Sequence, residues 1–358
     1  MAPSSSFDLS SVYPPNTAIN VEDVYGIVKT GDFTFKGKEP LQKPAAAARG
    51  AYGGNIAGQA VLVAIRSSPE GFFPHSLHSY FVKPVSSTAV VDWEVEEISS
   101  GKNFCNRAVK GSQDGELKFF ANVSLTKRNS FKTSMDKYED YVKKEEEKAK
   151  RTKEGTSDGD EDDDDDDPVL RPLSFQTPQH DWFDRNKVQD IPLDTRGACN
   201  LVYHKLPEEM HDLQLTGRED SIPAAERRVS YYTQWGIENE GGVNQPLTGV
   251  TKEFQFVGLA VISDALFLTR LARVLRVEGV DLKDFVHYFS VSLDHIIYFH
   301  DEDFDTTKWM QFSFKAVRLV NNKALLEAEM YDSKGVHVAT VIQEGLVHFN
   351  GLESHAKL

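Results

Sequence analysis

One carboxylate interrupts an otherwise apolar stretch of this sequence. Asp264 lies in VISDALFL, residues 261–268, and its neighbours Val261, Leu266 and Leu268 predict a largely enclosed helix. A buried carboxylate loses much of its hydration energy unless it is paired, hydrogen-bonded or protonated. Asp264 is therefore a candidate acid–base group. The alternative is structural, because a carboxylate at the start of a helix also stabilises the helix dipole.

Two further polar residues stand in strands that are otherwise apolar. Ser292, in SVSLDH, falls within the first strand predicted after that helix, and Gln343, in TVIQEGL, interrupts an apolar strand near the end of the sequence. Each also has a structural explanation, because strand hydroxyls and amides often only complete hydrogen bonds. With Asp264 they supply an acid, a hydroxyl and an amide, which can activate and orient a water molecule.

Other catalytic signatures are missing from the sequence. It contains no GxSxG elbow, no GxxxxGK[ST] phosphate loop and no HExxH zinc helix, and QWGIENEGG lacks the dinucleotide fingerprint. Cys105 and Cys199 show no CxxC or Cys/His ligand spacing, which indicates neither a disulfide framework nor a metal site. Several histidines and one aspartate fit hydrogen-bonded strand residues: His78, His295, His300 and Asp294.

Apolar periodicity predicts a scaffold in two halves. In residues 20–127 the turn-rich RGAYGGN precedes a helix over NIAGQAVLVAIRSS, and four strand-like runs follow, from LHSYFVKP to ELKFFANVSLTK. Residues 183–350 repeat this order, with strands at IPLD and ERRVSYYTQW, a helix over about 258–277, and four runs from HYFSVSLDHIIYFH to VHVATVIQEGLVHF. We therefore expect two related α+β modules in tandem, each an antiparallel sheet with a helix on one face.

A highly charged segment, residues 128–182, joins the modules. Its part DKYEDYVKKEEEKAKRTK is compatible with a solvent-exposed helix, and the aspartate tract that follows is expected to be disordered, because its charges repel one another. A solvated linker is the simplest interpretation. A regulatory or calcium-binding role is the alternative, although a plain aspartate run lacks the glycine and carbonyl ligands of a calcium loop. An N-terminal extension, residues 1–19, and a tail, residues 351–358, flank the modules.

Composition limits the possible classes of function and the compartment. The 358 residues carry a formal net charge of −15, but nine negative charges lie in residues 158–167, and no basic stripe indicates nucleic-acid binding. No apolar run reaches the roughly 18 residues of a membrane span, and no secretion signal is present at the N-terminus. The two cysteines indicate a reducing compartment. The final Ala356-Lys357-Leu358 resembles the SKL peroxisomal address.

Five sequence blocks together resemble one family, the TesB-type acyl-CoA thioesterase II family, including its peroxisomal members. In order they are GGNIAGQAVLVAI, HSLHSYFVKP, ISDALFL, VSLDHIIYFH and VIQEGL, spread over roughly residues 20–349. The resemblance implies a double hotdog fold, in which each antiparallel sheet wraps around a long central helix. It also implies a catalytic trio, which falls by position on Asp264, Ser292 and Gln343. The charged insertion extends beyond the family's pattern.

The resemblance also implies an activity: hydrolysis of fatty acyl-CoA to fatty acid and coenzyme A, without a cofactor or metal. Water activated by the trio would attack the thioester, and backbone N–H groups at the N-terminus of either module's helix would stabilise the oxyanion. Four residues are assigned to substrate binding, of which the glycine pair allows close backbone approach: Gly53, Gly54, Gln59 and His78.

A thioesterase with this ending is expected in the peroxisomal matrix, with the import receptor as a partner of Ala356-Lys357-Leu358. Assembly into homo-oligomers is what the family suggests. Two alternatives stay open. A hotdog enoyl-CoA hydratase would use an aspartate–histidine pair, and a non-catalytic acyl-CoA binding protein would be marked by loss of the trio.

Overall fold

Two halves, each a sheet with a central helix, form the body of the protein in a computed structural model that describes residues 16–44, 48–153, 169–199, 201–238, 242–277 and 288–357. The first half contains helix α2 (Gly53–Arg66) and strands β2 (Ile27–Gly31), β3 (Thr34–Gly37), β4 (Phe73–Phe81), β5 (Asp92–Ser100), β6 (Phe104–Gln113) and β7 (Glu116–Thr126). The second contains α5 (Lys252–Ser263) and strands β8 (Leu193–Cys199), β9 (Val202–Lys205), β10 (Val229–Trp235), β12 (Phe289–Ser292), β13 (Asp294–Phe299), β14 (Met310–Val320), β15 (Lys323–Tyr331) and β16 (His337–His348).

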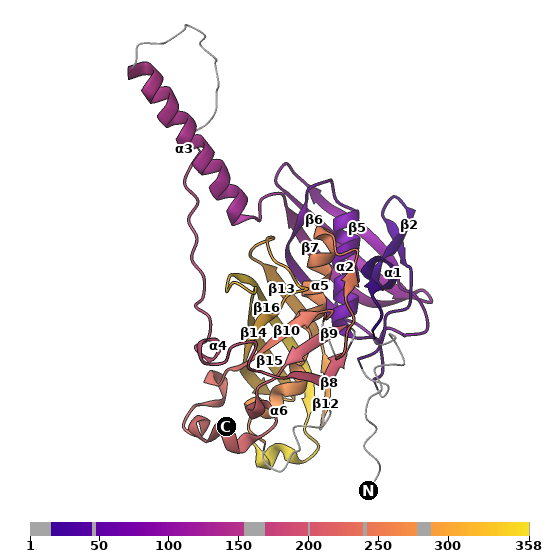
Figure 1. Ribbon diagram of the computed structural model, residues 1–358. Helices are drawn as coiled ribbons and strands as arrows, with labels where there is room; N and C mark the ends of the chain where they lie inside the picture. Colours follow the sequence, from indigo (N-terminus) through magenta and orange to yellow (C-terminus); the bar gives the residue numbers. More distant parts are fainter. Residues whose placement is uncertain are drawn as a thin grey trace.

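These strands form one continuous antiparallel sheet. Within the described ranges its order is β2-β3-β5-β6-β7-β4 in the first half and β13-β16-β15-β14-β10-β9-β8 in the second, with β12 also paired to β16. The halves join where β4 pairs with β13, with Ser79 opposite His295. The sheet curves around α2 and α5, which lie side by side in the middle of the body (Figure 1). This is the α+β architecture predicted from the sequence.

The central helices can be enclosed because they are apolar on nearly every side. In α2 every residue from 54 to 64 is buried. The two helices run antiparallel: Gly54, at the start of α2, approaches Val261, near the end of α5, whereas Arg66, at the end of α2, pairs with Glu253, at the start of α5. One helix start therefore meets one helix end at each side of the pair.

The second central helix differs from the prediction. Apolar periodicity favoured a helix over about 258–277, but α5 begins at Lys252 and ends at Ser263. Asp264 is its C-cap residue, and Leu266 then adopts a positive φ of 63°. The apolar pattern continues past the helix because the turn that follows is itself largely buried. Asp264 thus lies at the end of a helix rather than within one, so a favourable interaction with the start of its own helix is excluded.

The stretch from Lys252 to Val274 is long and apolar enough to cross a membrane by composition alone. In the structure it comprises α5, the 3₁₀ turn η5 (Leu268–Arg270) and the short helix α6 (Leu271–Val274). Because 78% of its most apolar window is buried inside the protein, its hydrophobicity is accounted for by the core of the second half.

A β-bulge divides the strand that carries Ser292. One strand was predicted over HYFSVSLDHIIYFH, whereas β12 and β13 are separate in the structure. Ser292 pairs with Gly345 of β16, but Ile296 pairs with Ile342, so the register shifts by one residue between the two pairs. Because of this shift, Ser292 and His295 both lie on the side of the sheet that faces the helices, although they are three residues apart.

Elements before α2 were not predicted from the sequence. They are the short helix α1 (Val21–Tyr25) and the hairpin formed by β2 and β3, which extends the first half of the sheet. Strand β1 (Ile19–Asn20) pairs with β11 (Leu247–Thr248) and so ties this region to the second half. The second half also carries short 3₁₀ turns: η2 (Glu208–Met210), η3 (Leu213–Glu219), η4 (Ala224–Glu226) and η6 (Leu352–His355).

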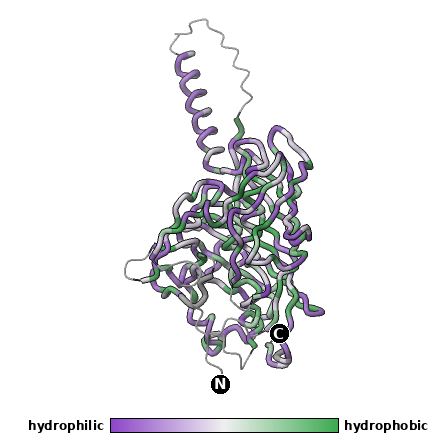
Figure 2. Tube along the Cα trace, turned by 90° about the vertical axis from the view of Figure 1, so that its right-hand side faces the viewer, coloured by the Kyte–Doolittle hydropathy of each residue, from purple (hydrophilic) through white to green (hydrophobic). Residues whose placement is uncertain are grey.

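The charged segment between the halves begins with a helix that projects from the body (Figure 1). This helix, α3 (Phe131–Lys153), has no buried residue, and Figure 2 shows it as largely hydrophilic. It agrees with the solvent-exposed helix considered for this sequence. The aspartate tract falls in residues 154–168, outside the described residues. The chain from 169 onward runs back along the second half to α4 (Trp182–Arg185).

Candidate active site

Three polar side chains of the second half meet at one amide nitrogen. Gln343 Nε2, from β16, lies 2.8 Å from Asp264 Oδ1 and 2.6 Å from Ser292 Oγ. Gln343 is fully buried, whereas Asp264 and Ser292 keep partial exposure. The structure therefore brings together the three residues that the sequence singled out, although they are far apart along the chain.

The first half contributes a hydrogen bond to the same cluster. The backbone N–H of Gly54, in the first turn of α2, donates to Asp264 Oδ2 at 2.9 Å. A carboxylate is unfavourable at the negative end of its own helix, α5, but favourable at the positive end of another. The start of α2 thus supplies the electrostatic support that the end of α5 lacks. The cluster lies at the junction of the two halves.

Burial dominates the acidity of Asp264. It raises the pKa of the carboxyl to about 6, and the hydrogen bonds from Gln343 and Gly54 act in the opposite direction, because they stabilise the ionised form. A carboxylate with a pKa near 6 is ionised at neutral pH but is a stronger base than an exposed aspartate. This is the range expected of a general base that works near neutral pH.

Glycine is required where α2 meets α5. A Cβ added to Gly53 would lie 2.7 Å from Asp264 Oδ2, and one added to Gly54 would lie 2.5 Å from the carbonyl oxygen of Val261. Both distances are shorter than real contacts of a Cβ atom. A side chain at Gly54 would meet the backbone of α5 and force the helices apart, whereas one at Gly53 would displace the carboxylate of Asp264. Gly53 is partly exposed and Gly54 is buried. Gly53 thus lies against the carboxylate of Asp264 and Gly54 against the backbone of α5, while their assignment to substrate binding stays a prediction.

Two tyrosines hold the backbone on either side of Asp264. The hydroxyl of Tyr52, in the first half, donates to the carbonyl oxygen of Val261 at 2.8 Å. The hydroxyl of Tyr231, on β10, donates to the carbonyl oxygen of Ala265 at 2.8 Å. The turn that presents Asp264 is thus anchored from both halves.

Two residues assigned to substrate binding lie away from this cluster. Gln59 is fully buried in the first half, where its Oε1 accepts from Trp93 Nε1 at 2.9 Å and its Nε2 donates to the carbonyl oxygen of Tyr25 at 3.1 Å. His78 lies on the opposite side of the sheet from the buried Leu77, with its ring against Tyr298. Gln59 is thus engaged in core hydrogen bonds, and His78 faces outward.

The C-terminal tripeptide lies only partly within the described residues. Ala356 packs against the hydrophobic core, and the N–H of Lys357 donates to the carbonyl oxygen of Leu275 at 2.8 Å. Arg227 also donates to the carbonyl oxygen of Lys357, at 2.6 Å. Leu358 is outside the described residues.

A histidine not assigned to the site reaches the end of α5. His295 Nε2 lies 2.8 Å from the hydroxyl of Ser263, the residue before Asp264. The interpretation of His295 as an ordinary hydrogen-bonded strand residue missed this link. The signal in the sequence was Ser263, a polar residue directly before Asp264 in an apolar helix, which needs a hydrogen-bond partner when buried. Asp294 forms the simple hydrogen bond expected of it, accepting from the N–H of Glu344 at 2.7 Å.

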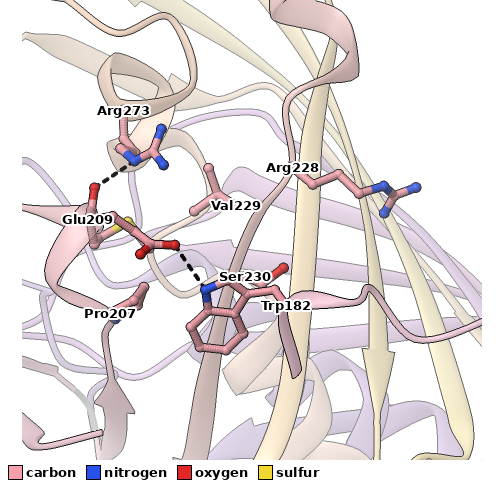
Figure 3. A pocket seen from close by; sticks show the side chains of 8 residues that line it. Trp182, Pro207, Glu209, Arg228, Val229, Ser230 and Arg273 are labelled. Atoms are coloured by element: carbon pink, nitrogen blue, oxygen red, sulfur yellow. Dashed lines mark hydrogen bonds between the residues drawn. The ribbon is translucent and has the colours of Figure 1, made fainter. Parts of the chain in front are cut away.

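A separate pocket lies on the second half, near α4, β10 and α6 (Figure 3). Its lining residues are Trp182, Pro207, Glu209, Met210, Arg228, Val229, Ser230 and Arg273. Both arginines are paired within the protein, Arg273 with Glu219 and Arg228 with Glu329, and Trp182 donates to Glu209. These pairs account for the charges without a ligand. In the part of the chain that the structure describes, no group of three His, Cys, Asp or Glu residues could hold a metal ion.

Family models match both halves of the chain. One described as the acyl-CoA thioesterase N-terminal domain matches residues 41–126, and one described as the acyl-CoA thioesterase C-terminal domain matches residues 217–347. Together they cover more than half of the 358 residues.

Similar proteins extend over most of the chain. The peroxisomal acyl-coenzyme A thioester hydrolase 1 of Saccharomyces cerevisiae is 24% identical over 340 residues, covering 92% of this chain and 94% of the yeast protein. The crystal structure of an acyl-CoA thioesterase II from Mycobacterium marinum is 18% identical, with a TM-score of 0.59 over 92% of this chain and 99% of that chain. A protein with a hot dog fold from Alicyclobacillus acidocaldarius is 14% identical, with a TM-score of 0.58 over 91% of this chain and 97% of that chain. The predicted double hotdog fold is confirmed, and the chain belongs to the acyl-CoA thioesterase II family of thioester hydrolases.

Proposed function

We propose that this protein hydrolyses fatty acyl-CoA with a water molecule activated by Asp264, Ser292 and Gln343. The observation that carries the proposal is the single amide nitrogen of Gln343, which bonds both the carboxylate and the hydroxyl. Two groups that share one nitrogen are close enough for one water molecule to contact both. An acid and a hydroxyl at such a spacing suit the activation of water rather than a covalent intermediate.

Hydrogen-bond counting assigns a role to each side chain. The amide of Gln343 has two hydrogens, and Asp264 and Ser292 accept one each. The hydroxyl hydrogen of Ser292 is then the donor that holds the water oxygen, while Asp264 accepts a water hydrogen. Gln343 fixes the spacing between these two groups. This refines the sequence-based hypothesis, in which Gln343 contacted the water itself.

The start of α2 is the source we assign for oxyanion stabilisation. The sequence left open which central helix serves, but the start of α5 carries Glu253, paired with Arg66 at the far side of the helix pair. The start of α2 lies beside Asp264. Because the N–H of Gly54 bonds Asp264, the neighbouring N–H of the partly exposed Gly53 is the donor we propose for the developing oxyanion.

The proposed reaction proceeds by direct attack of water on the thioester. The water oxygen attacks the thioester carbon while Asp264 takes one water proton, and negative charge collects on the carbonyl oxygen. Collapse of this intermediate breaks the carbon–sulfur bond, and the thiolate of coenzyme A leaves with the proton held by Asp264. The products are the fatty acid and coenzyme A.

The geometry favours hydrolysis over hydration of a double bond. A hotdog hydratase would need an aspartate and a histidine that act together. Here the described partners of Asp264 are Gln343 and Gly54, and the imidazole of His295 is bonded to Ser263 instead. A purely binding protein would not need a base whose pKa is raised toward neutrality.

The proposed function predicts thiol release that depends on pH. Purified protein mixed with a saturated acyl-CoA should release free thiol, and kcat/KM should fall about tenfold per pH unit below about 6, because protonated Asp264 cannot accept a proton. The titratable groups bonded to residues 261–265 are Tyr52, Tyr231 and His295. Burial holds the pKa of Tyr231 well above its usual value and lowers the pKa of His295 to about 3. The measurement is a thiol-reagent assay from pH 4.5 to 9. Absence of thiol release, or a rate independent of pH below 6, would contradict the proposal.

We also propose a peroxisomal location for this activity. Support comes from the terminal Ala356-Lys357-Leu358 and from the similar yeast protein, which is named as peroxisomal. A fluorescent protein fused to the N-terminus should accumulate in peroxisomes, and deletion of Leu358 should move it to the cytosol. Unchanged import after the deletion would count against this role of the tripeptide.

A further inference from the structure

The inward-facing position of His295 is created by the bulge between β12 and β13. Ile296 pairs with Ile342, so His295 and Gln343 are the next residues along the two strands. On its other side His295 pairs with Ser79 of β4, at the seam between the halves. The side chain of His295 is fully buried and reaches α5. It therefore connects the strand region around Gln343 with the end of the helix that carries Asp264.

The hydrogen bonds of Ser263 determine which nitrogen of His295 carries the proton. Both side chains are fully buried. Ser263 Oγ donates its single hydrogen to the carbonyl oxygen of Ala260 at 2.9 Å, so it must accept from His295 Nε2, 2.8 Å away. The imidazole is therefore protonated at Nε2. Burial lowers the pKa of His295 to about 3, so the ring stays neutral wherever Asp264 is ionised.

The Nδ1 atom of His295 is buried and has no hydrogen-bond partner among the described residues. Leaving a buried acceptor unpaired costs about 1–3 kcal/mol. An apolar residue of similar size would avoid this cost and could still fill the core. Stability alone therefore does not account for a histidine here, and the contact with Ser263 is the feature that an apolar residue would lose.

We propose that His295 is a positioning residue for the thioesterase reaction, which holds the end of α5 through Ser263 so that Asp264 keeps its hydrogen bonds to Gln343 and Gly54. The inference rests on the proposed function of Asp264. The histidine does not touch the reacting atoms. It acts through the helix end, directly before the residue that does.

The test separates positioning from ordinary core packing by replacing His295 in two ways. His295→Leu removes the donor to Ser263 but keeps an apolar filling, whereas His295→Gln offers an amide N–H in its place. Ser79→Ala is the matched control, because the buried hydroxyl of Ser79 donates to the backbone oxygen of the same His295 at 2.7 Å without reaching Ser263. For each variant we would measure the melting temperature, kcat and KM with a saturated acyl-CoA, and the acid limb of kcat/KM.

His295→Leu is expected to lower kcat by about 10- to 100-fold with little change in KM, since a shift of about 1 Å in a catalytic group can cost that much. Its acid limb should move to a pH above that of the wild type, because Asp264 loses hydrogen bonds that keep its pKa down. His295→Gln should recover most of kcat and the wild-type limb. Ser79→Ala should lower the melting temperature but leave the limb in place.

Several outcomes would overturn the proposal. If His295→Leu has the wild-type kcat and an unshifted acid limb of kcat/KM, His295 is an ordinary core residue. The same conclusion follows if Ser79→Ala shifts the acid limb as far as His295→Leu does. If His295→Leu does not fold, Ser263→Ala removes the same hydrogen bond from the other side, and an unshifted limb there would be equally decisive. Failure of the wild type to release thiol would instead refute the proposed function, and the two failures are thereby distinguished.

Discussion

Asp264→Asn is expected to lower thioester hydrolysis by about 10²–10⁴-fold, the contribution typical of a general base. The asparagine side chain keeps the shape of aspartate and can still accept from the N–H of Gly54, so the fold should be retained. It cannot accept a proton from water at any accessible pH. The measurement is thiol release from a saturated acyl-CoA, with circular dichroism to verify folding. Equal rates in the mutant and the wild type would exclude Asp264 as the base.

The same substitution should make the protein more stable at alkaline pH. Burial raises the folded-state pKa of Asp264 to about 6, above its value in the unfolded chain, so the folded state binds this proton more tightly. Stability therefore decreases as pH rises from about 4 to 6 and stays lower above that range, by about 3 kcal/mol for a shift of about two pKa units. Asp264→Asn should raise the melting temperature at pH 8 and change it little at pH 4. A decrease at pH 8 would show that the ionised carboxylate stabilises the fold.

Gly54→Ala is expected to have the second largest effect, a loss of about 10²-fold in kcat/KM, as for a catalytic group displaced by about 1 Å. The new Cβ would lie 2.5 Å from the backbone oxygen of Val261 and 2.7 Å from the ring of Tyr52. Relief requires α2 and α5 to separate, which weakens the hydrogen bonds to Asp264 and Val261. The overpacking should also cost about 1–3 kcal/mol of unfolding free energy. Steady-state kinetics and thermal unfolding measure the two effects.

Gly58→Ala is the matched control for this prediction. Gly58 lies one turn further along α2 and faces the same helix, but its Cβ would meet side-chain methyls of Val261 and Val257 at 3.1 and 3.2 Å and the carbonyl oxygen of Val257 at 3.2 Å. These contacts are milder, and alanine favours helix over glycine by about 1 kcal/mol. We expect activity within a few-fold of the wild type. If Gly54→Ala were no worse than Gly58→Ala, close approach at Gly54 would not be what maintains the site.

The architecture was predictable because its signals are local. The helix over NIAGQAVLVAIRSS and the strand-like runs after it appear in the structure as α2 and β4 to β7. The end of α5 was not predictable in the same way. The turn after Ser263 is as apolar as the helix before it. The hydropathy of the sequence therefore does not mark the residue at which the helical hydrogen bonding ends. That boundary determines whether Asp264 is a helix residue or a cap.

The sequence could name the residues of the candidate site but not their geometry. Sequence blocks identified Asp264, Ser292 and Gln343, and no pattern indicated that one nitrogen would join them. The bulge before β13 was also hidden, because strict alternation places Ser292 and His295 on opposite sides of a strand. The hydrogen bonds of Gln59 in the core could not be predicted from the sequence either, because its partners Trp93 and Tyr25 are brought to it only by the packing of the first half.

The antiparallel packing of α2 and α5 also bears on the number of active sites that we expect in one chain. The pairing creates two junctions. At one the start of α2 meets the end of α5, and at the other the start of α5 meets the end of α2. At one of them the amide of Gly54 faces the carboxylate of Asp264. At the other junction, Glu253 at the start of α5 forms an ion pair with Arg66 at the end of α2. The C-cap residue of α2 is Ser67, whereas the C-cap residue of α5 is Asp264. Among the described residues, the proposed site therefore forms at one of the two junctions, and we predict one active site per chain.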